Sequence, residues 1–211
     1  MKLRLVILIL SIHFFTIAYS SDYDIVIVGA TPGGIMTAIS AARQGKTALL
    51  LERTSHIGGL PANGLGATDI ATRGATTGLF QEFTKRIKQY YVDTYGIHSA
   101  QVADCSDGFH FEPSVAESVF TTMLDECNDK ITVLTMRQFD SYSCNVEISD
   151  SVISSIKVIN RLTGAEECYS GRMFADATYE GDLGAAAGVP FRVGREPASM
   201  YNEPGAGKVY E

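Results

Sequence analysis

Apolar positions within residues 24–52 change their spacing twice, which predicts a strand, a helix and a second strand. Residues 25–28 form an unbroken apolar run, as is typical of a strand buried on both faces of a parallel sheet. Apolar residues then recur at helical spacing over residues 33–44, and residues 46–51 return as another buried strand. The helical positions are Ile35, Ala38, Ile39 and Ala42. This order predicts a βαβ unit of an α/β fold.

The turn between the first strand and the helix contains Gly29, Thr31, Pro32, Gly33 and Gly34. Its pattern is G-x-T-x-G-G, in which Thr31 stands where the usual dinucleotide motif has its middle glycine. The first N–H groups of a helix lack partners within it, so a pyrophosphate can bind them. Glu52, at the end of the second strand, can accept hydrogen bonds from a ribose. The alternative is a βαβ unit whose glycines only permit tight packing of helix on strand.

Two later segments bear on the choice of dinucleotide, because Glu52 would serve the adenosine ribose of NAD as well as that of FAD. Residues 53–69 contain Gly58, Gly59, Gly64 and Gly66, which allow backbone to lie close against a flat ligand and its phosphates. A second segment, FADATYEGDLGAAAGVP, covers residues 174–190. Both segments favour FAD.

The blocks GATPGGI, LLLERTSHIGG, NGLGATD, FEPSVAE and DATYEGDLGAAAGVPFRVGRE follow one another in a specific order and spacing. With them the chain resembles the bacterial and fungal FAD-dependent oxidoreductase family, a branch of the glutathione-reductase-like flavoproteins. The resemblance extends over residues 23–211. It implies an α/β fold, in which a Rossmann-like FAD-binding domain with a parallel sheet carries a small β-meander.

The resemblance also implies which residues contact FAD. The glycine turn would hold the dinucleotide and Glu52 its ribose, while Arg53, Gly58 and Gly59 would contact the phosphates or the adenine side. Related flavoproteins have Ala-Thr-Gly after the last meander strand, where this chain has Ala177, Thr178 and Tyr179, and the tyrosine marks a subtype. Ala177, Thr178 and Asp182 are therefore expected at the cofactor. The alternative for residues 176–182 is an ordinary acidic loop.

The middle of the chain changes from a helical to a strand-like period. Residues 77–91 read as an amphipathic helix, and a second helix opens at residues 112–114 and runs through Leu124. Ser114 and Glu117 have the spacing of a capping box. Four alternating stretches follow, at residues 131–136, 144–149, 152–160 and 167–175, with turns at Asp150-Ser151 and Thr163-Gly164. The first should join the parallel sheet, and the other three should form a β-meander at about residues 142–175.

Residues 1–20 have the features of a secretory signal peptide, with Lys2 and Arg4 before an apolar stretch and a small-x-small end at Ser20. The apolar stretch is about fourteen residues, which is short for a spanning helix of about twenty. We therefore expect cleavage after Ser20, a secreted protein, and no stable membrane association afterwards. The alternative is an uncleaved membrane anchor.

Composition excludes several function classes. With 45% hydrophobic residues the chain of 211 residues can bury a core, and its net charge of −7 without a basic cluster argues against nucleic acid as a partner. The four cysteines could form one or two disulfides in three connectivities, but the lack of C-x-x-C argues against a disulfide reductase. The histidines lie at no metal-ligand spacing relative to the cysteines, so no metal site is expected.

The expected function is oxidation of an organic small molecule by hydride transfer to FAD, with oxygen or a small diffusible acceptor taking the electrons. No catalytic base can be assigned. Five polar residues are candidates, and a structural role is an equal alternative for each: Asp69, Arg73, His110, Glu112 and Arg195. Residues 21–211 are expected to be the N-terminal portion of the FAD-binding domain, without the substrate domain and the C-terminal FAD segment. Two other readings stay open, an NAD(P)-dependent Rossmann enzyme and a secreted, non-catalytic or inactive flavoprotein-derived fragment.

Overall fold

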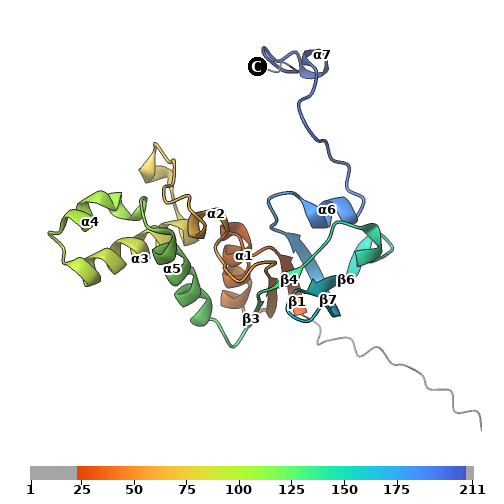
Figure 1. The fold of residues 1–211 in the computed structure, drawn as a ribbon, viewed down its shortest axis with the longest axis horizontal. Helices are drawn as coiled ribbons and strands as arrows, with labels where there is room; N and C mark the ends of the chain where they lie inside the picture. The colour runs from red at the N-terminus through yellow and green to blue at the C-terminus, as the bar shows by residue number, and fades with distance from the viewer. Residues whose placement is uncertain (1–22, 208–211) are drawn as a thin grey trace, which may run out of the picture.

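The computed structural model describes residues 23–207, and the predicted signal peptide lies outside them. The chain forms an α/β fold with a mixed sheet whose strand order is β3-β2-β1-β7-β6-β4, and β5 pairs with β6. Figure 1 shows the sheet between a helical layer that contains α3, α4 and α5 and a meander that contains β6. The predicted fold class is confirmed.

The predicted βαβ unit is present. It consists of β1 (Tyr23–Val28), α1 (Pro32–Arg43) and β2 (Ala48–Leu51), and the two strands pair in parallel. Pro32 occupies the first helical position, where its missing N–H has no cost because no partner exists there. β3 (Ile131–Leu134) pairs in parallel with β2, so the first of the alternating stretches joins the parallel sheet as predicted.

The side chains of β1 alternate between two cores. Ile27 packs with residues of α1, α3 and α5, while Val26 and Val28 pack with the meander and with α6 (Asp182–Ala186). The strand is therefore covered on both faces, which is why its sequence is a continuous apolar run instead of an alternating one.

The crossover from β2 to β3 is helical. It contains α2 (Gly59–Ala62), η1 (Arg73–Ala75), α3 (Gly78–Tyr95), α4 (Ala100–Asp104), η2 (Ser106–Gly108) and α5 (Pro113–Asp125). The two long helices were predicted and the short ones were not. Phe83 of α3 and Phe120 of α5 are buried and stack with ring centroids 4.4 Å apart. Aromatic packing thus joins these helices.

The predicted capping box at the start of α5 is wrong. Pro113 is the first helical residue, so Glu112 occupies the N-cap position and Ser114 lies inside the helix. No side chain caps this end, and Glu117 instead accepts a bond from His56 Nδ1 at 3.0 Å. Glu117 therefore ties α5 to the segment after β2.

The predicted meander is present. It contains β5 (Val146–Ser149), β6 (Val152–Asn160) and β7 (Glu166–Asp176), with the unpredicted β4 (Arg137–Gln138) beside β6. β7 changes partners along its length, because its first half pairs antiparallel with β6 and its second half pairs parallel with β1. The meander strand therefore becomes a strand of the parallel sheet.

Three further features concern the whole described chain. All four cysteines are free, so the possible disulfides are not formed in this structure. None of the helices within residues 23–207 has the length and hydropathy that a membrane span requires. The last helix, α7 (Ala198–Tyr201), lies away from the body at the end of an extended segment (Figure 1).

Candidate functional site

Three strands end side by side and bring the predicted site residues to one edge of the sheet. Val28 of β1 is in register with Leu51 of β2 and with Asp176 of β7. The segments that follow these strands therefore leave the sheet together. In open α/β sheets ligands bind outside the carboxyl ends of the strands, which is where these segments meet.

The glycine turn has two glycines that the chain itself requires. Gly29 adopts φ of 99°, and a Cβ there would lie 2.7 Å from the carbonyl oxygen of Ala177. A Cβ at Gly34 would overlap the carbonyl oxygen of Gly29. These two positions are explained by tight packing, the alternative that the sequence left open.

Gly33 is different because no neighbouring group excludes a side chain there. It is exposed in the first turn of α1, and the nearest atom to a Cβ would be Thr31 Oγ1, at 3.7 Å. Close packing within the described chain does not explain this glycine. A ligand that lies against the first turn of α1 would explain it.

Thr31 gives a physical reason for the departure from the usual glycine motif. Its hydroxyl accepts a hydrogen bond from the N–H of Gly34 at 3.3 Å and donates one to the carbonyl oxygen of Ala177 at 2.9 Å. The side chain thus caps α1 and also fixes the segment after β7.

Glu52 lies at the end of β2, where it is 8% exposed. Its Oε2 accepts from the N–H of Ala30 at 3.0 Å, and its Oε1 accepts from the N–H and hydroxyl of Thr54 at 2.8 and 2.9 Å. A carboxylate offers about four acceptor positions, so a further position is left for a hydroxyl group. Glu52 therefore orients the glycine turn and can still bind a ligand.

The acidic segment after β7 is organised by its own side chains. Asp176 accepts bonds from the N–H and hydroxyl of Thr178 at 3.0 and 2.7 Å, and from the N–H of Gly184 at 2.9 Å. Thr178 Oγ1 in turn accepts from the N–H of Asp182 at 3.0 Å. These bonds hold the segment against the end of the sheet.

A cavity of about 540 Å³ lies between these segments. Seven of the predicted cofactor residues line it: Gly29, Thr31, Glu52, Arg53, Gly59, Thr178 and Asp182. The other five, Pro32, Gly33, Gly34, Gly58 and Ala177, belong to the surrounding turns and are not among its lining residues. Gly58 packs against Ala62 and Phe120, so its role lies in the chain's own packing.

Several lining residues were not predicted. They are Val28, Leu51, Thr54, Leu60, Asn63, Arg137, Phe139, Tyr179, Glu180 and His56. His56 lies beside the predicted phosphate-binding segment in the sequence, and a surface or packing role was the expectation for it over direct contact with the cofactor. Arg137 and Phe139 come from β4 and the residue after it, and a two-residue strand leaves no periodic pattern to find. Tyr179 did leave a signal, because it replaces the glycine of related flavoproteins.

Neighbouring groups shift the pKa values of the charged side chains at and beside the cavity. The Arg137 guanidinium binds Glu167 at 3.0 and 3.2 Å, and this hydrogen bonding lowers the pKa of Glu167 to about 2. The same carboxylate raises the pKa of Arg137. Burial, with help from Glu180, raises the pKa of Asp182. The cavity thus has a permanently charged arginine on one wall and a cluster of acids on another.

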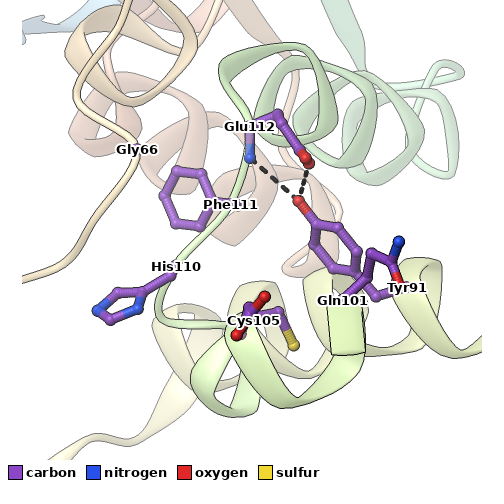
Figure 2. Close-up of a pocket in the computed structure, with 8 residues that line it drawn as sticks. Gly66, Tyr91, Gln101, Cys105, His110, Phe111 and Glu112 are labelled. Atoms are coloured by element: carbon purple, nitrogen blue, oxygen red, sulfur yellow. Dashed lines mark hydrogen bonds between the residues drawn. The ribbon is translucent and has the colours of Figure 1, made fainter. Parts of the chain in front are cut away.

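A second cavity, of about 310 Å³, lies in the helical layer and shares no lining residue with the first. Figure 2 shows the Tyr91 hydroxyl directed at Glu112, to whose carboxylate it donates while it accepts from the Glu112 N–H at 3.0 Å. Burial, and then the Glu112 carboxylate, raise the pKa of Tyr91 to about 12. This tyrosine therefore stays protonated near neutral pH and fixes the start of α5.

None of the five candidates for the catalytic base, all within residues 23–207, lines the larger cavity. Glu112 and His110 line the smaller one, and the His110 ring points away from the Tyr91–Glu112 pair (Figure 2). Arg73 stacks on Phe109 and donates to the carbonyl oxygen of Ser106 at 2.8 Å, which is a structural role. No catalytic residue is assigned by this geometry. Within residues 23–207, no group of His, Cys, Asp and Glu is arranged to hold a metal ion.

The sequence profile of the FAD dependent oxidoreductase family matches residues 24–210. The chain therefore belongs to the FAD-dependent oxidoreductase family. Dependence on FAD is the property that names this family.

Solved structures of two dehydrogenases share the fold. L-proline dehydrogenase from P. horikoshii superposes with a TM-score of 0.53 and 14% identity, over 83% of this chain and 58% of that one. Glycerol-3-phosphate dehydrogenase from Bacillus halodurans, complexed with FAD, superposes with a TM-score of 0.52 and 8% identity, over 80% of this chain and 37% of that one. Digeranylgeranylglycerophospholipid reductase from Methanocella arvoryzae is 50% identical over 38 residues, which are 18% of this chain and 10% of the reductase. The chain thus spans only part of each of these proteins.

Proposed function

We propose that this chain binds FAD in the larger cavity, and that the protein oxidises a small organic molecule by hydride transfer to the flavin. The observation that carries the proposal is the meeting of the glycine turn, Glu52 and the Ala177-Thr178 segment at one cavity, beside a glycine that the chain's own packing does not require. The family to which the chain belongs supports the choice of FAD.

The residues present fit such a cofactor. Gly33 leaves the first turn of α1 open to a phosphate, and Glu52 retains an acceptor position for a ribose hydroxyl. The cavity volume of about 540 Å³ is within the usual range for small-molecule sites. Of the two arginines in the lining, Arg137 is already paired with Glu167, so Arg53 is the one placed to meet a phosphate.

When bound, the flavin supplies the atom that accepts the hydride. The residues described here hold and orient the nucleotide: the first turn of α1 binds phosphate, Glu52 binds ribose, and Thr31 keeps the two turns in register. Catalytic groups and substrate contacts are not assigned to this part of the protein.

Visible absorption of the purified 211-residue chain tests the cofactor proposal. FAD is added and the excess is removed by gel filtration. Flavin bands that stay with the protein and are shifted from those of free FAD support the proposal. A folded chain that remains colourless contradicts it for this chain and favours the reading as a non-catalytic or inactive fragment.

An NAD(P)-dependent enzyme is the second candidate, because a carboxylate placed like Glu52 suits either adenosine ribose. Ligand-induced stabilisation separates the two, since a ligand that binds only the folded state raises the melting temperature. A shift with NAD(P)H and none with FAD would favour the second candidate.

We also propose that the protein is exported, on the basis of residues 1–20 alone. Soluble NAD(P)H is scarce outside the cell, so oxygen or a small diffusible molecule would accept the electrons. The net charge of −7 supports a small-molecule partner over nucleic acid. Amino-terminal sequencing of the exported protein should begin at Ser21, whereas an intact start in the membrane fraction would indicate an anchor.

A further inference from the structure

Tyr179 connects two walls of the larger cavity. Its hydroxyl accepts a hydrogen bond from the N–H of Leu60 at 2.6 Å, across 119 positions in the sequence. Tyr179 belongs to the segment after β7, and Leu60 belongs to α2. Both residues line the cavity.

Gly59 provides the space for this contact. A Cβ at Gly59 would overlap the Tyr179 hydroxyl, and it would also lie 3.2 Å from Pro32 Cδ and from Thr31 Cα. The hydroxyl therefore sits where the second glycine turn, the first glycine turn and the segment after β7 come together. Gly59 also adopts φ of 56°, in the left-handed region that favours glycine, so the backbone and the approach of Tyr179 both suit a glycine here.

The N–H of Leu60 lies in the first turn of α2, where the helix offers no internal partner. Nor does a side chain at the N-cap position supply one, because that residue is Gly58. The tyrosine hydroxyl meets this need from a distant segment, which a glycine at position 179 could not do.

We propose that Tyr179 is a positioning residue for the cofactor site, which holds the Gly58–Leu60 turn against the dinucleotide turn. The inference rests on the proposed FAD site. A turn that is held in place before the ligand arrives lowers the entropy cost of binding FAD. Tyr179 is 56% exposed, so its ring contributes little to the core and its effect should lie in the geometry of the site.

The test compares three variants of the 211-residue chain. Tyr179→Phe removes only the hydroxyl, and Tyr179→Gly restores the residue of related flavoproteins. Tyr142→Phe is the matched control, because Tyr142 is 69% exposed and does not line the cavity. Three quantities are measured: amide hydrogen exchange at Leu60 without nucleotide, the FAD dissociation constant by flavin fluorescence, and the melting temperature.

In Tyr179→Phe, the Leu60 amide should exchange faster and the FAD dissociation constant should rise about fivefold, the factor for losing one neutral hydrogen bond. Tyr179→Gly should weaken FAD binding at least as much. The melting temperature should stay close to that of the parent. If Tyr179 had a merely structural role, its replacement would lower the melting temperature instead. Tyr142→Phe should resemble the parent in all three measurements.

Tighter FAD binding by Tyr179→Phe would overturn the proposal, because the hydroxyl would then compete with the ligand for the Leu60 N–H. Unchanged Leu60 exchange would also overturn it. If Leu60 exchange responds as expected but neither parent nor variants bind FAD, the FAD proposal fails, while the conclusion that Tyr179 holds the Gly58–Leu60 turn stands. The two proposals can therefore fail separately.

Discussion

Replacing Gly33 with alanine separates packing from ligand binding in the first turn of α1. The added methyl group would meet only Thr31 Oγ1, at 3.7 Å, which is an ordinary van der Waals distance. The φ angle of Gly33 is also not in the left-handed region. The folded chain therefore accepts the methyl group, whereas a phosphate bound at this turn would have to occupy the same space.

The two effects have opposite signs. At a position with compatible backbone, Gly to Ala stabilises a protein by about 0.4–1 kcal/mol. For a chain of this length that corresponds to a melting temperature higher by about 1–4 °C. A methyl group forced into a well-packed contact costs about 1–3 kcal/mol, and FAD binding should therefore weaken by about 5- to 150-fold.

The assay pairs an FAD titration, followed by flavin fluorescence, with calorimetric melting of the same samples. Gly74→Ala is the matched control, because a Cβ at Gly74 also meets no close neighbour, while Gly74 belongs neither to the glycine turn nor to the cavity lining. Gly34→Ala is the contrasting variant, since its Cβ would overlap the carbonyl oxygen of Gly29 and should lower the melting temperature. A Gly33→Ala protein that is as stable as the parent and binds FAD equally well would refute the reasoning.

Three further outcomes are expected. Tyr91→Phe leaves the Glu112 N–H without its partner and should cost about 1–3 kcal/mol in urea unfolding, with FAD affinity unchanged, since Tyr91 lies outside the larger cavity. Phe120→Ala should cost about 3–5 kcal/mol in the same assay, because Phe120 is 1% exposed. A hydrogen bond from Arg43 lowers the pKa of Glu82 from 4.5 to about 2. The parent should therefore lose stability as pH falls through this window, and Glu82→Gln should show a flatter melting-temperature curve there.

The βαβ unit could be predicted because its signals are local. The strand, glycine turn, helix and second strand follow each other within residues 24–52, and each has its own spacing of apolar residues. The meander could be predicted for the same reason, because the Asp150-Ser151 turn separates two alternating stretches. The structure gives these two residues the positive φ angles, 50° and 65°, that such a turn needs.

The remaining parts of the site depend on contacts between distant segments. Arg137 and Phe139 reach the cavity through a two-residue strand without a pattern of its own. Glu117 has the spacing of a cap but binds His56, because Pro113 fixes the start of α5 one residue before Ser114. The sequence assigned the same cofactor role to Gly33 and Gly34. The structure distinguishes them, because the packing of the chain requires a glycine at Gly34 but not at Gly33.

The change of partners along β7 has a consequence for the order of folding. Its second half pairs with β1 across the intervening sequence of the helical crossover and the meander, and the Thr31–Ala177 bond joins residues 146 positions apart. Contacts of such long range form slowly, because the entropy of closing the loop must be met first. We therefore expect the proposed nucleotide site to form late in folding, so the appearance of bound flavin during refolding would report when β7 pairs with β1.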